Sequence, residues 1–259
     1  MPDLYRDRHV LLTGASAGIG AATARAFAER GDRVVLAARS QDRLRALASE
    51  IGDAAHVLPL DVADADAHAR AIGGLPEAWR AIDVAVLNAG LAKGLAPVWE
   101  NTAAEVDQMV DTNVKGVLNG IRAVVPGMLA RGRGHVIPIG STAGHFVYPG
   151  GTVYCATKHA VLALALGLKR DLHGTPVRVT AVSPGLVETE FSHVRFDGDA
   201  ARADAVYADT NALTAGDVAA AIVYAASAPE RVNVQEVLLT PRAQSAGGGI
   251  VRGDAAEGL

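Results

Sequence analysis

The sequence predicts an α/β protein with a doubly wound parallel sheet of about seven strands and helices on both faces. Short apolar runs of strand length alternate with longer Ala- and Leu-rich stretches of helix length along the chain. The runs are apolar throughout, which is typical of parallel strands buried on both faces. The first run leads directly into a Gly-rich turn that opens a helix, as at the start of a dinucleotide-binding unit. Together these observations predict a Rossmann fold.

The composition fits a globular chain with a large core. Half of the 259 residues are hydrophobic, and neither a repeat nor a linker divides the sequence. We therefore expect a single NAD(P)-binding Rossmann domain over residues 1–245. The Gly- and Ala-rich residues 246–259 are expected to form a flexible C-terminal tail.

Charge and hydropathy argue against several classes of partner. The net charge is -4 and the arginines are scattered, so no basic patch favours nucleic acid. No apolar run approaches the roughly 18 to 20 residues of a membrane span, and the N-terminal residues lack the apolar core of a signal peptide. We therefore expect a cytoplasmic protein that binds neither nucleic acid nor a membrane.

The residue types that bind metals lack the spacing of a dedicated metal site. The eight histidines and the single cysteine form no His-x-x-x-His or Cys-x-x-Cys pattern. Cys155 directly follows Tyr154, but adjacent side chains on a helix point in different directions, so a small buried residue is a better interpretation than a thiol nucleophile. We therefore expect no metal.

The first half of the chain predicts four strands, each followed by polar or glycine residues. They span residues 9–13, 33–38, 55–60 and 83–87, and the helices between them span 21–30, 41–51 and 64–81. Ser40 is expected to cap the second helix. Asp61 follows the third strand, where it could cap the next helix or receive the adenine amino group. Because ligands bind outside the carboxyl ends of parallel strands, this edge of the sheet is the expected site.

The second half predicts three more strands and three helical regions. The strands are expected at residues 135–140, 177–183 and 234–239, and the helical regions at 102–131, 151–173 and 215–228. Around residues 111–116 the first helical region is expected to be interrupted, either because the Asn113 amide opens it or because a glycine packs there. Pro138 leaves one ladder hydrogen bond of its strand unmade. The less regular residues 186–210 are the expected substrate cover.

The Gly-rich turn and the second strand predict the cofactor. Gly14, Gly18 and Gly20 follow the first strand, so backbone N–H groups at the helix start face a pyrophosphate. Such a turn also serves simply to pack a helix on a sheet, so it is weak evidence alone. Units that prefer NAD carry an acidic residue near the end of the second strand, but Arg39 stands there with no carboxylate beside it. An arginine at this position attracts the 2′-phosphate of the cofactor, which predicts NADP(H). The alternative is that Arg39 is simply a solvated residue at the end of the strand.

Ser141, Tyr154 and Lys158 predict the chemistry. Ser141 ends the fifth strand, and Tyr154 and Lys158 lie one turn apart on the next helix. A lysine ammonium there favours the phenolate. Lowering the pKa of a tyrosine from about 10 toward neutral pH requires about 4 kcal/mol, however, which one nearby charge barely supplies. We therefore expect Tyr154 to act as a general acid/base only beside an oxidised nicotinamide. The alternative is a packing tyrosine whose hydroxyl bonds to water or backbone.

These motifs occur in one order along essentially the whole chain, and the ordered set is far more specific than its members. In this set the chain resembles the classical short-chain dehydrogenase/reductase superfamily. The motifs are Thr13-Gly14-x-x-x-Gly18-x-Gly20, Asn88-Ala89-Gly90, Asn113, Ser141, Tyr154-x-x-x-Lys158 and Pro184-Gly185. Within the superfamily it is most similar to bacterial NADP-dependent 3-hydroxy acid dehydrogenases of the serine or allo-threonine type, through segments such as 139–144, 171–175 and 190–196.

The resemblance implies a homotetramer with a Ser141–Tyr154–Lys158 site, in which Asn113 supports a water that relays protons to Lys158. It also implies cofactor contacts at Gly14, Ser16, Ala17, Gly18, Ile19, Gly20, Arg39, Ser40, Asp61, Val62, Asn88, Ala89, Gly90, Tyr154, Lys158, Pro184, Gly185, Val187 and Thr189. Three residues depart from the family pattern. Leu87 replaces a mainly structural asparagine, and Pro138 and Ser183 affect the positioning of Ser141 and the nicotinamide loop.

The predicted function is hydride transfer between NADP(H) and a small hydroxy or carbonyl substrate, such as a 3-hydroxy acid. The expected substrate contacts are Ser141, Tyr154 and Arg195. Arg195 lies in the cover, where it would pair with a carboxylate or sulfonate, although a loop arginine is also commonly just solvated. Two other functions stay open, a broad aldehyde/ketone reductase of secondary metabolism and a non-catalytic cofactor-binding sensor or scaffold. The presence of the complete catalytic set disfavours the sensor.

Overall fold

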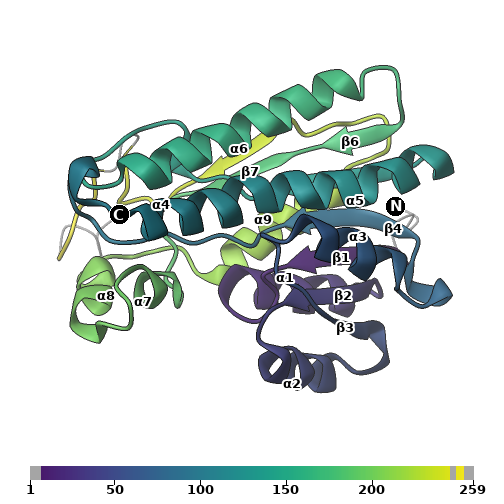
Figure 1. Cartoon of the computed structure of the whole chain (residues 1–259), viewed down its shortest axis with the longest axis horizontal. Helices are drawn as coiled ribbons and strands as arrows, with labels where there is room; N and C mark the ends of the chain where they lie inside the picture. The colour runs from purple at the N-terminus through teal and green to yellow at the C-terminus, as the bar shows by residue number, and fades with distance from the viewer. Residues whose placement is uncertain (1–6, 246–248, 254–259) are drawn as a thin grey trace.

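Six parallel strands form the central sheet of the computed structural model, which describes residues 7–245 and 249–253. The strands are β1 (His9–Thr13), β2 (Arg33–Ala38), β3 (Ala55–Pro59), β4 (Ile82–Leu87), β5 (Gly134–Pro138) and β6 (Val177–Val179). Their order across the sheet is β3-β2-β1-β4-β5-β6 (Figure 1). The chain moves outward from β1 to β3 and then returns to β4 on the other side of β1. The carboxyl ends of β1 and β4 therefore flank the point where ligands bind in such sheets.

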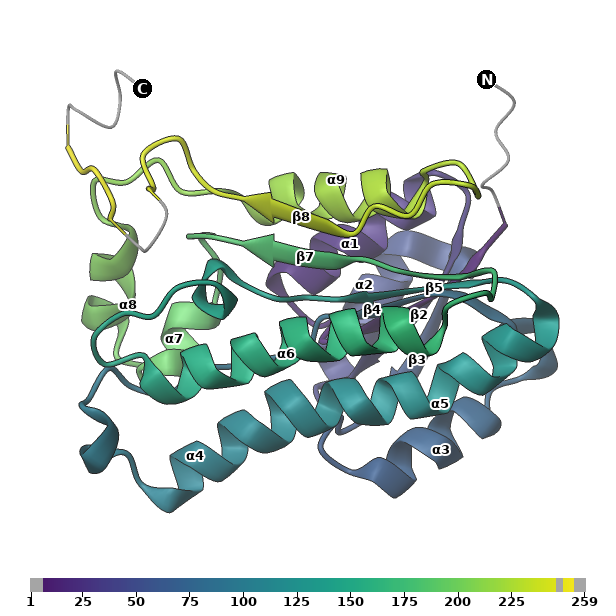
Figure 2. The ribbon, with the colours of Figure 1, turned by 90° about the horizontal axis from the view of Figure 1, so that it is seen from above.

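The strands are apolar on both faces because helices cover the sheet from both sides. Along β1, Val10 and Leu12 belong to one buried cluster and Leu11 to the other. One helix layer consists of α1 (Gly18–Glu29), α2 (Gln41–Ile51) and α9 (Ala215–Ala226). The opposite layer consists of α3 (Ala65–Gly73), α5 (Gly116–Arg131) and α6 (Thr152–Asp171) (Figure 2). The two layers confirm the predicted doubly wound α/β fold.

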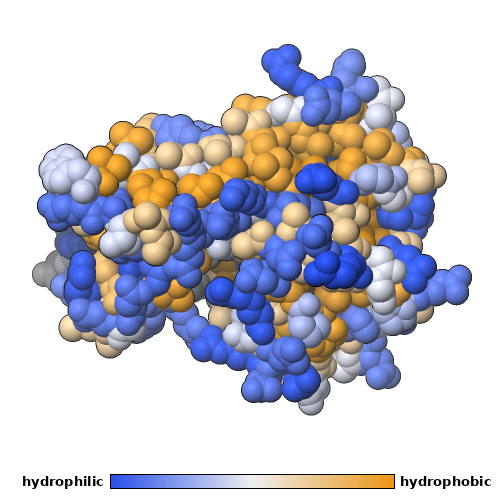
Figure 3. Space-filling model, in the orientation of Figure 1, coloured by the Kyte–Doolittle hydropathy of each residue, from blue (hydrophilic) through white to orange (hydrophobic). Residues whose placement is uncertain are grey.

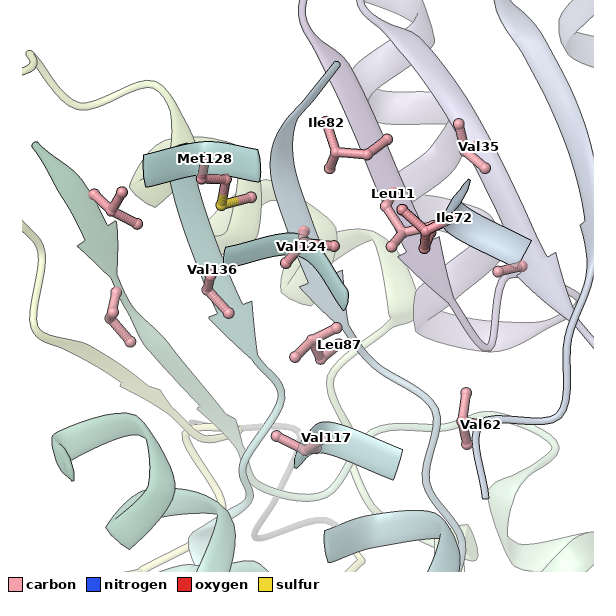
Figure 4. Close-up of a cluster of buried hydrophobic side chains, with 14 of the residues drawn as sticks. Leu11, Val35, Val62, Ile72, Ile82, Leu87, Val117, Val124, Met128 and Val136 are labelled. Carbon is pink, nitrogen blue, oxygen red and sulfur yellow. The ribbon is translucent and has the colours of Figure 1, made fainter. Parts of the chain in front are cut away.

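Helix α5 packs closely on β4 and β5. Val124 and Met128 lie over these strands in one continuous apolar cluster (Figure 4). Gly120 permits the contact, since a Cβ at this position would lie only 2.6 Å from the Leu87 side chain. Leu87 is 2% exposed, so this departure from the family pattern is a core residue and not part of the site.

The last strands differ from the predicted single sheet of about seven strands. Residues 177–183, expected as one strand, form β6 and then β7 (Ala181–Pro184), which pairs with β8 (Glu236–Leu239) in a two-stranded parallel sheet. The change occurs at the buried Thr180, whose N–H donates to the Val136 carbonyl at 3.1 Å and whose hydroxyl donates to the Val234 carbonyl at 2.6 Å. After Thr180 the chain gains β8 as a partner, while the residues just beyond β5 stay bonded to β7 through the Gly140 N–H, which donates to the Val182 carbonyl at 2.8 Å.

The helix expected at residues 64–81 is shorter. Helix α3 ends at Gly73, and a 3₁₀ turn, Glu77–Trp79, follows it. Two consecutive glycines weaken the helix, and Pro76 lacks the N–H that would continue it. Further 3₁₀ turns lie at Gly52–Ala54, Val98–Glu100 and Thr142–Gly144.

The long helical region is interrupted where the sequence predicts. Helix α4 (Ala103–Val110) begins with a capping box formed by Thr102 and Glu105. A π-helical turn, Asp111–Lys115, then separates α4 from α5. Asn113 lies within this turn.

The segment predicted as an irregular cover contains two short helices, α7 (Phe191–Arg195) and α8 (Ala200–Tyr207). Asp199 caps α8 by accepting the Arg202 N–H at 3.1 Å. Strands β7 and β8 point toward these helices (Figure 2). The cover therefore lies beyond the carboxyl edge of the sheet.

Part of the predicted C-terminal tail is bonded to the rest of the chain. The Val251 N–H donates to the Ala243 carbonyl and the Gly253 N–H donates to the Asp209 carbonyl, each at 2.9 Å. Residues 246–248 and 254–259 lie outside the described residues, so the predicted flexibility stays a prediction for them. Among the described helices, none combines the length and apolarity needed to cross a membrane.

Candidate active site

A cleft of about 700 Å³ opens between the carboxyl ends of the strands and the cover. It is lined by every predicted cofactor and substrate residue except Gly20. Asn113 does not line it either and lies buried behind the wall. The structure thus brings together in one cavity residues that the sequence spreads from Gly14 to Arg195. Within the described part of the chain, no group of His, Cys, Asp and Glu side chains is arranged to hold a metal ion.

The Gly-rich turn after β1 forms one wall of the cleft. Gly14 has a φ of +66°, and a Cβ on it would lie 2.9 Å from the Ala89 Cα. A Cβ on Gly20 would lie 2.1 Å from the Gly14 carbonyl oxygen, so Gly20 closes the turn and does not contact the cavity. No side chain caps the start of α1, and its first turn carries no acidic residue. Its first N–H groups are therefore suited to an anion.

Asn88 joins the ends of β4 and β1. Its amide Nδ2 donates to the carbonyls of Thr13 at 3.0 Å and Gly14 at 3.3 Å. The Ala89 N–H donates to the Thr13 hydroxyl at 3.1 Å. This bracing holds the Gly-rich turn in place.

Arg39 and Ser40 stand at the end of β2. The Arg39 side chain is exposed and makes no hydrogen bond or ion pair with another described residue. Ser40 holds the N-cap position of α2 as predicted, but its side chain makes no cap hydrogen bond. Both side chains are available to a ligand at this end of the cleft.

Asp61 lines the cleft next to the end of β3. Its Oδ1 accepts the Ala63 N–H at 3.0 Å. Asp64, not Asp61, caps α3 by accepting the Ala67 N–H at 2.9 Å. Of the two uses that the sequence left open for Asp61, the structure excludes the helix cap.

Ser141 and Lys158 line the same cleft because the turn that follows Ser141 packs directly against α6. Ser141 starts the 3₁₀ turn Thr142–Gly144, and its hydroxyl accepts the Ala143 N–H at 3.1 Å. A Cβ on Gly144 would lie 2.7 Å from the Lys158 carbonyl oxygen, so only glycine allows this approach. The Ser141 side chain lies close enough to Tyr154 to lower the pKa of the tyrosine hydroxyl. The Lys158 Nζ lies 5.9 Å from the centre of the Tyr154 ring and donates to the Ile139 carbonyl at 2.8 Å.

Burial shifts both catalytic candidates toward their neutral forms. Burial, with Tyr148 nearby, raises the pKa of Tyr154 above its usual value, and the Ser141 side chain and the charge of Arg195 offset this in part. Burial lowers the pKa of Lys158 to about 8. The sequence predicted that Lys158 would lower the pKa of Tyr154. The protein alone shows the opposite direction for Tyr154, because desolvation of a buried phenolate outweighs the cations around it.

Asn113 ties three elements together behind the site. It is 1% exposed, and its Oδ1 accepts the Leu91 N–H at 2.8 Å while its Nδ2 donates to the Leu91 carbonyl at 2.8 Å. The same Nδ2 donates to the Thr157 hydroxyl at 3.0 Å, and that hydroxyl donates to the Tyr154 carbonyl at 2.7 Å. The amide therefore holds the loop after β4 against the first turns of α6.

Arg195 of α7 reaches back into the cleft. Its Nε donates to the Gly94 carbonyl at 2.8 Å, and its Nη2 donates to the Tyr148 hydroxyl at 3.0 Å. The guanidinium carbon lies 5.8 Å from the centre of the Tyr154 ring. A cation with a fixed direction thus stands beside the candidate acid/base, in a cover that Lys93 and Asp197 also fasten by an ion pair.

Comparison with known proteins now identifies the family. A family model described as short chain dehydrogenase matches residues 8–200. The chain belongs to this family. It is 48% identical over 240 residues to the NADP-dependent 3-hydroxy acid dehydrogenase YdfG of Salmonella typhi, covering 92% of this chain and 97% of the relative. It is 42% identical to the serine 3-dehydrogenase of Agrobacterium fabrum, covering 92% of this chain and 96% of that protein.

Solved structures agree with the sequence relatives. The closed form of a serine dehydrogenase complexed with NADP+ superposes with a TM-score of 0.91 at 44% identity, over 95% of this chain and 99% of that chain. A serine dehydrogenase from Escherichia coli gives a TM-score of 0.81 at 41% identity, over 91% of this chain and 99% of that chain. The predicted resemblance to the 3-hydroxy acid and serine branch of the short-chain dehydrogenases is confirmed.

The residues of this short-chain dehydrogenase fit a phosphorylated dinucleotide. The uncapped start of α1 suits a pyrophosphate, and Arg39 and Ser40 provide a cation and a hydroxyl for a ribose phosphate. Tyr154 and Lys158 lie in the same cleft as these groups. The size of the cleft is within the range of cofactor pockets.

Sequence reasoning missed several residues that line the cleft. Tyr148 lies in the Gly-rich turn before α6, and Gln244 and Ile250 come from the C-terminal segment. Arg43 lies in the first turn of α2 and faces Glu190 of the cover. For Tyr148 the sequence did hold a local signal, because a glycine pair beside an aromatic residue indicates close packing. In the structure, a Cβ on Gly151 would lie 2.2 Å from the Tyr148 ring.

Proposed function

We propose that this chain is an NADP-dependent oxidoreductase that interconverts a small 3-hydroxy acid and the corresponding carbonyl compound. One observation carries the proposal. Buried Ser141 and Lys158 and the partly buried Tyr154 share a cleft with the anion-binding candidate Arg195 at one end and with Arg39 at the other. The NADP-dependent 3-hydroxy acid dehydrogenase and serine dehydrogenase relatives support this choice of substrate and cofactor.

Ser141 and Tyr154 handle the substrate oxygen. NADP(H), when bound, supplies the acceptor or donor of the hydride. The Tyr154 hydroxyl transfers the proton at the substrate oxygen, and the Ser141 hydroxyl holds that oxygen by a hydrogen bond as its charge changes. The raised pKa of Tyr154 keeps it protonated in the protein alone, so it is ready to donate in the direction of carbonyl reduction. In the direction of alcohol oxidation it needs additional positive charge to accept a proton.

Lys158 provides a titratable cation beside the tyrosine. Its pKa of about 8 lies close to neutral pH, so its ammonium can release a proton and its neutral amine can accept one in the working range. Asn113 lies near Lys158, since a Cβ on Gly90 would be 3.2 Å from the Asn113 Oδ1 and 3.5 Å from the Lys158 Nζ. It belongs to a π-helical turn that leaves one backbone carbonyl without its α-helical partner. We assign to this turn the support of a water that relays protons to Lys158.

Arg195 selects an acidic substrate. Its guanidinium is fixed by Gly94 and Tyr148, and it stands beside Tyr154. A carboxylate on the substrate would bring the hydroxyl carbon to a defined position next to the Tyr154 oxygen. Arg39 and Ser40 similarly select NADP(H) through the 2′-phosphate.

The assembly is proposed to be a homotetramer in the cytoplasm. Apolar residues gather on the surface over α5 and α6 (Figure 3). On these two helices Leu118, Leu129 and Leu166 are 37%, 42% and 53% exposed. A contiguous apolar surface of this kind favours association with a second copy of the chain. Light scattering on the purified protein measures the mass, and a monomer would contradict the tetramer.

A substrate panel tests the proposed function. Purified protein is mixed with NADP+ and, in separate reactions, with serine, a 3-hydroxy acid without an amino group, and an uncharged alcohol of the same length. Formation of NADPH, measured by absorbance, is expected with the acids and much more slowly with the alcohol. Equal rates with the alcohol would indicate the broad reductase instead. Absence of any turnover together with tight NADPH binding would indicate a sensor.

A further inference from the structure

An ion pair crosses the mouth of the cleft at its cofactor end. The Arg43 Nη1, in the first turn of α2, donates to the Glu190 Oε2 at 2.5 Å. Glu190 is the N-cap residue of α7, at the start of the first cover helix. Both residues line the cleft. Two segments 147 residues apart in the sequence are thus joined next to the end of β2.

Arg43 belongs to the same end of the cavity as Arg39 and Ser40. All three line the cleft, and they occupy β2's carboxyl end and the first turn of α2. The Arg39 side chain has no hydrogen-bond or ion-pair partner among the described residues, whereas the Arg43 side chain is paired with Glu190. The 2′-phosphate end therefore presents one available cation and one that a carboxylate already holds.

The ion pair is of a kind that a phosphate can displace. The Arg43 and Glu190 side chains are 56% and 58% exposed, and exposed ion pairs contribute little. A phosphate monoester carries nearly two negative charges and offers three acceptor oxygens, so it is a stronger partner for a guanidinium than a single carboxylate. A phosphate held by Arg39 would also repel the nearby Glu190.

We propose that Arg43 is a second specificity-determining residue for the 2′-phosphate, and that this phosphate competes with Glu190 for the Arg43 guanidinium. The inference rests on the proposed use of NADP(H) and extends it to the cover. Thr189 lies against the Gly-rich turn, since a Cβ on Gly18 would be 3.3 Å from its side chain. Glu190 is the next residue, so the cover begins directly beside the expected cofactor site. Release of Glu190 by the phosphate frees one fastening of the cover.

Substitutions of Arg43 and of Glu190 are expected to change the affinity for NADPH in opposite directions. Dissociation constants are measured by fluorescence titration with NADPH, and with NADH as the ligand that lacks the 2′-phosphate. Arg43→Gln is expected to raise the dissociation constant of NADPH about tenfold and to leave that of NADH unchanged. Glu190→Gln is expected to lower the dissociation constant of NADPH about threefold, because the competing carboxylate is gone.

Arg45→Gln is the matched control. Arg45 lies on the same helix but bonds to Asp42 and Gln41 and does not line the cleft, so both constants should stay at the wild-type values. Equal losses for NADPH and NADH in Arg43→Gln, or weaker NADPH binding in Glu190→Gln, would overturn the inference. A wild type that binds NADH as tightly as NADPH would instead remove the proposed cofactor choice.

Discussion

At the catalytic end of the cleft the polar side chains are buried and bonded within the chain, whereas at the end of β2 they are exposed. Lys158 is 5% exposed and donates to the Ile139 carbonyl, and Asn113 uses its whole amide on Leu91 and Thr157. Arg39 is exposed, and Arg43 is paired with the exposed Glu190. The first set keeps its geometry without a ligand, and the second acts mainly through its charge.

This difference separates rate from selectivity. A buried group that holds or transfers a proton contributes where the charge changes, so its loss lowers the turnover number. An exposed cation recognises a phosphate that takes no part in the reaction, so its loss changes which cofactor binds. Substitutions at the two ends should therefore produce different kinetic patterns.

Replacement of Lys158 should have the largest effect. Lys158→Met keeps the length of the side chain but removes the cation beside Tyr154, and we expect the turnover number to fall about 10³-fold at saturating NADP+. Steady-state absorbance measurements give this number. Lys169→Met, on the same helix but outside the cleft, is the control and should retain wild-type turnover. A loss of less than tenfold in Lys158→Met would show that the Lys158 ammonium does not assist proton transfer.

Arg195 should affect only acidic substrates. Arg195→Met is expected to lower kcat/KM for a 3-hydroxy acid about 100-fold, because a charged hydrogen bond is lost. The uncharged alcohol of the same length should lose less than about threefold, since it never paired with the guanidinium. Equal losses on both substrates would show that Arg195 serves only to hold the cover through Gly94 and Tyr148.

The buried Lys158 should also make stability depend on pH. Its pKa falls from 10.5 to about 8 on folding, so the unfolded chain binds more protons between these values. Stability must therefore rise with pH in that window, and below pH 8 the folded state bears the full penalty of the buried ammonium. Relative to Lys158→Met, the wild type is expected to gain about 2 kcal/mol of unfolding free energy between pH 7 and pH 10. Urea unfolding at several pH values measures this gain, and a constant difference between the two proteins would contradict the burial effect.

Arg39 should have the smallest effect and only on cofactor choice. Arg39→Gln is expected to lower the preference for NADPH over NADH about tenfold, because the mutant retains the backbone cradle but loses one cation. The ratio of kcat/KM for the two cofactors measures this preference. An unchanged ratio would leave Arg43 as the main recognition residue for the 2′-phosphate.

The sequence predicts best where local geometry determines position. Tyr154 and Lys158 are one helical turn apart, and Ser141 closely follows the buried strand β5, so both elements deliver their side chains to the same edge of the sheet. The interruption at Asn113 was also readable, because asparagine and glycine are poor residues for a helix interior. Whether each of these residues has its predicted role stays a prediction.

The features that the sequence did not predict depend on distant contacts. The switch of strand partner at Thr180 needs the Val234 carbonyl, which lies 54 residues later. The pair of Arg43 and Glu190 depends on how the cover folds over α2, and the direction of the Tyr154 pKa depends on burial. None of these leaves a local pattern in the sequence.

The central claim is that the Tyr154 hydroxyl transfers the proton, and Tyr154→Phe tests it most directly. NADPH formation from a 3-hydroxy acid is measured at saturating NADP+, and the dissociation constant of NADPH is measured by fluorescence titration. We expect the rate to fall about 10³-fold while the dissociation constant stays within about twofold of the wild type, because phenylalanine preserves the ring and its packing on Phe191. A rate within tenfold of the wild type would contradict the account.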